Sequence, residues 1–151
     1  MRIVGKNVVI YGLGASGIAA YGLAKEKGAK VIVYDDDQNL KGATHAKSVF
    51  DGADLVVLSP GVDGAKDFLL DARLSSLQVT SELMLASEFC AAEQIAVTGT
   101  NGKTTTTLLI DAILKRSGAH SHAVGNIGTP FSAIADKLDS TETAVIEASS
   151  F

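Results

Sequence analysis

Residues 94–104 read QIAVTGTNGKT, a short apolar run followed by a glycine-rich turn that carries Lys103 and Thr104. An apolar run that ends in glycines and leads into helical periodicity is typical of a buried parallel strand followed by a turn and a helix. The backbone N–H groups of such a turn can surround phosphate oxygens, while the lysine contacts the β- and γ-phosphates and the threonine hydroxyl binds Mg²⁺. We therefore predict a phosphate-binding P-loop in this stretch.

The turn is a compact variant of that loop. The common form G-x-x-x-x-G-K-[ST] would place its first glycine at position 97, which is Val97 here. The sequence has G-x-x-G-K-T instead, preceded by Thr98. Because a lysine in such a turn rarely has a purely structural role, we assign phosphate contacts to the whole turn: Gly99, Thr100, Asn101, Gly102, Lys103 and Thr104.

A second glycine turn lies earlier in the chain, where residues 12–17 read GLGASG. It matches G-x-G-x-x-G between a predicted strand and a predicted helix, so a diphosphate could approach the backbone at the helix N-terminus. Asp35 closes the next predicted strand, where an acid can accept hydrogen bonds from a ribose or a base. NAD and a UDP-sugar both fit this pattern, and the glycines could also serve helix–strand packing alone. Three consecutive acids at positions 35–37 disfavour NADP, whose extra phosphate they would repel.

Strands and helices alternate along the rest of the chain. This order predicts an α/β fold: a Rossmann-like, doubly wound parallel sheet in residues 1–92, followed by the start of a P-loop ATPase domain in residues 93–151. The predicted strands are residues 7–11, 30–34, 55–59, 78–80, 94–98, 120–124 and 143–147. The predicted helices are residues 16–27, 66–74, 81–89 and 103–117, with one more that Thr129 caps and Pro130 begins.

Composition excludes several classes of function. Hydrophobic residues make up 46% of the 151 residues and the net charge is −4, with no cluster of basic residues, which argues against nucleic acid and anionic membranes as partners. A single cysteine, Cys90, allows no intrachain disulfide, so we expect a cytoplasmic protein. His120 and His122 share one face of a predicted strand but lack a third ligand, so we expect surface histidines.

The compact loop resembles the T-G-T-N-G-K-[ST] signature of the Mur ligase and folylpolyglutamate synthetase superfamily. Three further motifs are similar to the Mur ligases that add D-glutamate: SPG at residues 59–61, GNIG at 125–128 and EASSF at 147–151. Their order and spacing agree over all 151 residues. The folate enzymes lack the first nucleotide-binding unit, and the alanine-adding relatives usually carry histidine where this chain has Asn101.

The resemblance implies that the first unit binds the UDP part of the substrate UDP-N-acetylmuramoyl-L-alanine, and not NAD. In the second unit it implies ATP contacts that extend to Thr105 and catalytic roles for Lys103 and Glu147. Mg²⁺ would be held by Thr104 and Glu147. The residues expected at the UDP-linked substrate are Gly14, Ala15, Ser16, Gly17, Asp35, Asp36, Ser59 and Asn126.

The implied reaction is formation of an amide in peptidoglycan synthesis. The substrate carboxylate attacks the γ-phosphate of ATP to give an acyl phosphate, and the amine of D-glutamate then displaces phosphate. The family's second metal site and its D-glutamate domain would lie beyond Phe151, so we expect the chain alone to be inactive and to form a homodimer through an uncovered strand edge. Two alternatives stay open: a nucleotide-binding module without ligase activity, and a small P-loop NTPase, which is disfavoured because no general base or arginine finger can be assigned.

Overall fold

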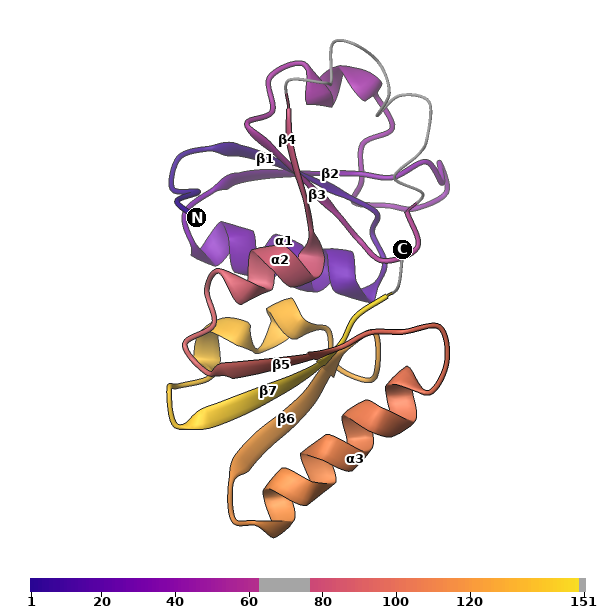
Figure 1. Cartoon of the computed structure of the whole chain (residues 1–151). Coiled ribbons are helices and arrows are strands. Elements are labelled where there is room, and N and C mark those ends of the chain that lie inside the picture. The colour runs from indigo at the N-terminus through magenta and orange to yellow at the C-terminus, as the bar shows by residue number, and fades with distance from the viewer. Residues whose placement is uncertain (63–76, 150–151) are drawn as a thin grey trace.

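The protein contains two parallel β-sheets, as a computed structural model that describes residues 1–62 and 77–149 shows (Figure 1). The first sheet has the strand order β2-β1-β3-β4 and the second has the order β5-β7-β6. The strands are β1 (Asn7–Tyr11), β2 (Lys30–Tyr34), β3 (Leu55–Leu58), β4 (Gln78–Ser81), β5 (Glu93–Val97), β6 (His120–Gly125) and β7 (Glu142–Glu147). All pairs of these strands are parallel, which confirms the predicted α/β fold class.

The apolar run NVVIY forms the central strand β1, because four of its five residues can be buried from both faces of the sheet. Its neighbours are held in register, with Val8 opposite Val31 of β2 and Leu55 of β3. The helix α1 (Ala15–Glu26) follows β1 directly and packs its small residues against the sheet. The first glycine turn therefore lies at the carboxyl edge of this sheet, between β1 and α1.

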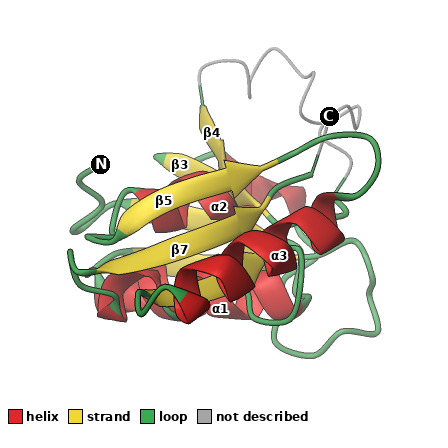
Figure 2. Cartoon of the chain, turned by 60° about the horizontal axis from the view of Figure 1, so that its bottom comes forward, coloured by secondary structure: helices red, strands yellow, loops and turns green. Residues whose placement is uncertain are grey.

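In the second sheet, β7 lies between β5 and β6, although it is the last of the three in the chain. The register places Glu147, the last residue of β7, directly between Val97 and Gly125. The helix α3 (Lys103–Arg116) covers the outer side of this sheet, as Figure 2 shows in front of β7. The segments that leave the three strands consequently meet at one edge.

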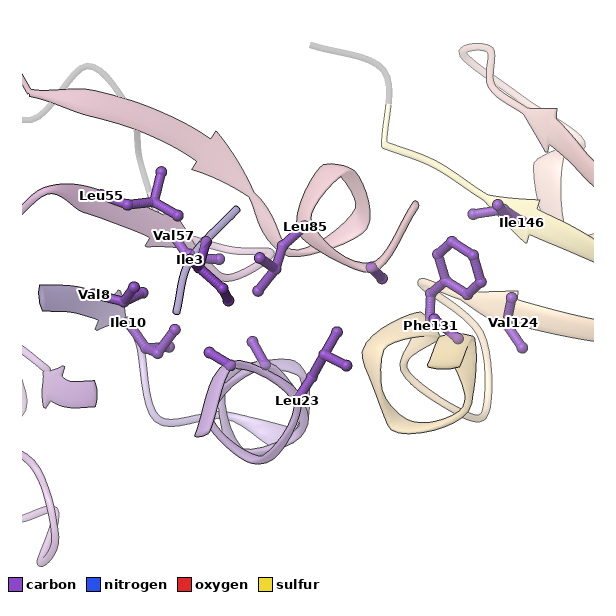
Figure 3. Close-up of a cluster of buried hydrophobic side chains, with 14 of the residues drawn as sticks. Ile3, Val8, Ile10, Leu23, Leu55, Val57, Leu85, Val124, Phe131 and Ile146 are labelled. Atoms are coloured by element: carbon purple, nitrogen blue, oxygen red, sulfur yellow. The ribbon is translucent and has the colours of Figure 1, made fainter. Parts of the chain in front are cut away.

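The two sheets share a continuous hydrophobic core. The helices α1 and α2 (Glu82–Ser87) lie between the sheets, together with the 3-10 turns η3 (Phe131–Ala133) and η4 (Ala135–Lys137) (Figure 1). In this layer Leu23, Leu85 and Phe131 approach one another from three different elements (Figure 3). In the sequence, residue 92 lies between the last helix of the first unit and β5 of the second. The hydrophobic core includes residues from both sides of this position, so the division of the chain into two domains there stays a prediction.

The sequence prediction differs from the structure after Thr129, where the predicted helix is wrong. The chain forms η3 and η4 instead, and Pro130, with φ −55° and ψ 140°, lies outside helical geometry. Ser132 gives both its N–H and its hydroxyl to the distant Glu82, which holds the segment away from a regular helix. The helix predicted at residues 66–74 lies outside the described residues. Within the described part of the chain, every helix is too short or too polar to span a membrane.

Candidate nucleotide-binding sites

The second glycine turn has the backbone geometry of a phosphate cradle. Gly102 precedes α3 with φ +75°, a conformation that L side chains rarely adopt, and so directs the first N–H groups of the helix at the turn. The Lys103 ammonium lies over its own loop and donates to the Gly99 carbonyl at 2.6 Å. Positive charge and unsatisfied N–H groups therefore converge at the N-terminus of a helix, where the macrodipole also favours an anion.

Thr104 and Glu147 meet at this turn, although 43 residues separate them in the sequence. The Thr104 hydroxyl donates to Glu147 Oε2 at 2.7 Å, across the carboxyl edge of the second sheet. A hydroxyl and a carboxylate are oxygen donors of the kind that Mg²⁺ selects. These residues fit a magnesium site beside a bound phosphate, which is the arrangement predicted for them.

The loop at residues 125–128 packs against the same acid. Gly125 has φ +101°, and a Cβ there would overlap the Glu147 carbonyl oxygen, so only glycine permits this approach. The Asn126 N–H donates to that carbonyl at 3.0 Å, and the Asn126 side-chain amide donates to the Ser149 hydroxyl. Asn126 is thereby held next to Glu147, which also binds Thr104. One predicted substrate residue therefore lies beside two residues predicted to bind ATP and Mg²⁺.

The shape of the first glycine turn depends on Ser59, which hydrogen-bonds it, and on Gly17, where a side chain would not fit. A Cβ on Gly17 would overlap the Gly12 carbonyl oxygen, so glycine allows α1 to begin directly against the end of β1. The Ser59 hydroxyl donates to the same carbonyl at 3.0 Å and is almost fully buried. Gly14 and Ala15 remain exposed at the start of the helix, where a diphosphate could meet them.

Asp35 and Asp36, two of the predicted substrate residues, both accept hydrogen bonds from other groups of the chain. Asp35 Oδ2 accepts a hydrogen bond from the Leu13 N–H at 2.7 Å, and Oδ1 accepts one from the Asp37 N–H at 2.9 Å. Asp36 accepts hydrogen bonds from the hydroxyls of Tyr11 and Tyr34. Ser59 and Asp35 thus brace the turn, whereas Asp36 binds two tyrosine hydroxyls of the neighbouring strands. The contacts of all three residues with a nucleotide stay predictions.

Sequence reasoning missed two residues beside these sites. His45 lies against Asp35, with its Nδ1 2.7 Å from the Asp35 carbonyl oxygen, because the chain after β2 returns and pairs Thr44 with Tyr34. Glu82 is 1% exposed and lies between the two units, where it binds Ser132. Neither belongs to a local motif, so only the fold reveals them.

A cavity of about 460 Å³ connects the two halves of the molecule. Ser59 and Pro60 contribute to it from the first unit, and Asn126 and Ser149 contribute from the second. Two of the predicted substrate residues, Ser59 and Asn126, therefore line one space. The other predicted substrate residues are not among those that line it: Gly14, Ala15, Ser16, Gly17, Asp35 and Asp36.

The fold and the site together define a class: an α/β protein whose second sheet carries a glycine turn with a lysine and a threonine, and an acid at the end of the neighbouring strand. Residues 97–151 match the Mur ligase middle domain. Relatives at 36% and 38% identity align with the whole chain. The chain belongs to the Mur ligase family, which confirms the resemblance.

Two similar curated proteins carry the same name. The chain is 36% identical to the UDP-N-acetylmuramoylalanine–D-glutamate ligase of Geobacter metallireducens and 38% identical to that of Koribacter versatilis. In both comparisons the match covers 100% of this chain and 37% of the relative. The chain thus spans little more than a third of the length of these ligases.

Solved structures support the fold. The UDP-N-acetylmuramate–alanine ligase of Thermotoga maritima superposes with a TM-score of 0.53 at 19% identity, covering 95% of this chain and 37% of that one. A ligase from Neisseria meningitides, named for UDP-N-acetylmuramate and L-alanyl-gamma-D-glutamyl-meso-diaminopimelate, gives 0.51 at 22% identity, covering 96% and 53%. The arrangement of two parallel sheets is therefore shared with Mur ligases of known structure.

Proposed function

We propose that this chain is the nucleotide-binding part of an ATP-dependent ligase that joins D-glutamate to UDP-N-acetylmuramoyl-L-alanine. The observation that carries the proposal is the hydrogen bond between Thr104 and Glu147 at a P-loop that opens α3. The relatives named as D-glutamate ligases support the choice of substrates. Because the chain spans 37% of their length, amide formation is proposed for a polypeptide of their full length.

The P-loop residues would bind and orient ATP. Lys103 would exchange the Gly99 carbonyl for phosphate oxygens, while the N–H groups after Gly102 hold the same phosphates. Thr104 and Glu147 would hold Mg²⁺, which neutralises charge on the phosphates when it is bound. The protein's part is then to position the γ-phosphate and to stabilise the charge that develops on it.

The reaction that this arrangement would serve has two steps. A carboxylate oxygen of the UDP-linked substrate attacks the γ-phosphorus, the bond to the bridging oxygen breaks, and ADP leaves with that electron pair. The amine of D-glutamate then attacks the acyl carbon, phosphate leaves, and the amine loses a proton. Asn126 would orient the acyl group, and its position beside Glu147 in the wall of the cavity supports this role.

Binding of ATP tests the second site. Thr104→Val keeps the shape of the side chain but removes its hydroxyl, so we expect the thermal stabilisation by MgATP to fall sharply, while Thr104→Ser retains it. Saturation at a hundred times Kd raises stability by about 2.7 kcal/mol, which a melting curve resolves easily. Thr106→Val is the matched control, since Thr106 is an exposed threonine on the same helix. An equal MgATP response in Thr104→Val and Thr106→Val would refute the site.

Binding of UDP tests the first site. We expect millimolar UDP to raise the melting temperature and NAD to leave it unchanged, because the acids at positions 35 and 36 can accept from a uracil N–H. Both acids also hold groups of the fold, Asp35 the glycine turn and Asp36 the Tyr34 hydroxyl, so the comparison of ligands is a cleaner test than their removal. Stabilisation by NAD without a response to UDP would favour the alternative, a nucleotide-binding module without ligase activity.

A further inference from the structure

The chain that follows β2 returns to the carboxyl edge of the first sheet and lies beside the first glycine turn. Main-chain hydrogen bonds fix its path: the Thr44 N–H donates to the Val33 carbonyl at 2.8 Å, and the Asp35 N–H donates to the Thr44 carbonyl at 3.2 Å. A Cβ on Gly42 would lie 3.8 Å from Leu13 Cδ2, which is ordinary contact with the turn. This returning segment therefore has a fixed place next to the turn.

His45, the next residue of this segment, is half-buried and uses only one ring nitrogen to contact the fold. Its Nδ1 lies 2.7 Å from the Asp35 carbonyl oxygen. A carbonyl oxygen can only accept, so Nδ1 carries the hydrogen, and Nε2 is the acceptor of the neutral ring. Across residues 1–62 and 77–149, no group hydrogen-bonds Nε2, whereas every fully enclosed side-chain nitrogen or oxygen has a partner. Nε2 therefore reaches solvent at this edge of the sheet.

The acids at the end of β2 already serve the fold. In strand–turn–helix units of this kind, an acid at the end of the second strand commonly accepts a hydrogen bond from a ribose hydroxyl. Here both carboxylate oxygens of Asp35 accept N–H groups of the chain, and both oxygens of Asp36 accept tyrosine hydroxyls. His45 Nε2 is a hydrogen-bonding atom at the same strand end that the described part of the fold leaves unused.

A hydroxyl group suits Nε2 better than the other polar groups of a nucleotide. It can donate to the neutral ring and accept from the protonated ring, so the hydrogen bond persists in either state. A base N–H can only donate, and the oxygens of an ionised phosphate can only accept. The two ribose hydroxyls of a ribonucleotide are therefore the matching partners.

We propose that His45 hydrogen-bonds a ribose hydroxyl of the UDP-linked substrate through Nε2 and so selects a ribonucleotide at the first glycine turn. This inference rests on the proposed binding of UDP at that turn. It involves neither the P-loop nor the formation of the amide.

Isothermal titration of the 151-residue chain with UDP tests the role of Nε2. Asparagine can keep the donor that reaches the Asp35 carbonyl but has nothing at the position of Nε2, so His45→Asn should weaken UDP binding by about three- to tenfold. Glutamine places its amide near the position of Nε2, so His45→Gln should stay within about twofold of the unmodified chain. If His45 only anchored its own segment, the order of the two variants would be reversed.

The ribose itself is tested with 2′-deoxy-UDP and 3′-deoxy-UDP. One of them should bind the unmodified chain about three- to tenfold more weakly than UDP, and His45→Asn should not weaken that nucleotide further. This comparison needs no variant, so it decides the matter even if His45→Asn fails to fold. His120→Asn, at the exposed start of β6 in the second sheet, is the matched control and should bind UDP as the unmodified chain does.

Two kinds of failure are distinguishable. Saturable UDP binding that is equal in the unmodified chain and in His45→Asn, a greater loss in His45→Gln than in His45→Asn, or equal binding of UDP and both deoxynucleotides would overturn the role of His45 alone. No saturable binding of UDP to the unmodified chain would overturn the proposed UDP site together with this inference.

Discussion

Gly17 and Gly22 lie on the same helix, yet their missing side chains have opposite consequences. At Gly17 a Cβ would overlap the Gly12 carbonyl oxygen, whereas at Gly22 it would meet no atom within 4 Å. Only the first glycine therefore serves the approach of α1 to the end of β1. The second leaves the helix with the backbone entropy cost of glycine and no packing benefit.

This contrast predicts opposite effects of the same substitution. Gly17→Ala should destabilise the chain and distort the first glycine turn, because the clash is with backbone that Ser59 also holds. Gly22→Ala should raise the free energy of unfolding by about 0.5–1 kcal/mol through helix propensity. Urea denaturation of the two variants measures both effects. Equal stability of the two variants would contradict this account of the turn.

Other side chains show how far sequence could predict the candidate sites. The motifs located both glycine turns, since phosphate binding needs a local pattern of glycine, lysine and threonine. They could not show that Asp35 and Ser59 hydrogen-bond the first turn itself, because those partners depend on how β2 and β3 flank β1. Glu82 lacked any such motif, and its burial follows from the packing of α2 on a segment 50 residues away.

At the scale of elements, α3 is attached to its sheet through polar side chains. Only Thr107 and Asp111 are buried on this helix. Asp111 accepts hydrogen bonds from the Ser121 hydroxyl of β6 at 2.7 Å and from Lys115 at 2.8 Å. Burial alone would raise the pKa of Asp111, but these two partners outweigh it and lower the pKa below its ordinary 3.8.

We predict that Asp111→Asn lowers the free energy of unfolding at neutral pH by about 1–3 kcal/mol, the range for a buried hydrogen bond to a charged group. The folded pKa is below the unfolded value of 3.8, so the carboxylate stabilises the fold above that pH and loses this effect as the pH falls through the folded pKa. The difference between the unmodified chain and the variant should thus shrink in acid. Urea denaturation across this range measures it, with exposed Asp51→Asn as control. A difference that stays constant with pH would contradict the linkage.

The elements themselves were predicted unevenly. Apolar strands such as β1 and β2 have the predicted bounds, because a buried parallel strand carries its signal in its own residues. The segment after Thr129 has a strong local signal for a helix, with a capping residue and Pro130 at the first turn. Burial of Phe131 and the hydrogen bonds of Ser132 with Glu82 outweigh that signal. Contacts between units override local propensity in this segment.

At the scale of the whole molecule, the shared core should make the two units unfold together. Phe131 belongs to the second unit, is fully buried, and packs in the cluster with Leu23 and Leu85 of the first (Figure 3). All three tyrosines, Tyr11, Tyr21 and Tyr34, lie in the first unit. Tyrosine fluorescence therefore reports on one unit, while far-ultraviolet circular dichroism reports on both.

We predict that Phe131→Ala destabilises the chain by about 3–5 kcal/mol. The unfolding transitions followed by tyrosine fluorescence and by circular dichroism should both move to lower denaturant, and by the same amount. The reason is that the cavity left by the ring would adjoin helices of the first unit as well as the second sheet. Leu109→Ala, at an exposed position of α3, should leave both unfolding transitions nearly unchanged. If the tyrosine transition stayed in place while the circular dichroism transition moved, the units would be independent.

The outer face of the molecule carries the last prediction. Leu108, Leu109 and Ile113 of α3 are 50%, 57% and 59% exposed, so this helix presents a contiguous apolar stripe to solvent. A second copy of the chain can cover the stripe, and we expect the sedimenting mass to rise above 15.6 kDa with concentration. Leu109→Lys should suppress that rise. Ile18→Lys, at a 58% exposed position on α1, should not, because no other exposed large hydrophobic residue lies on that helix. A mass of 15.6 kDa at every concentration would show that α3 tolerates its apolar stripe in water without a partner copy.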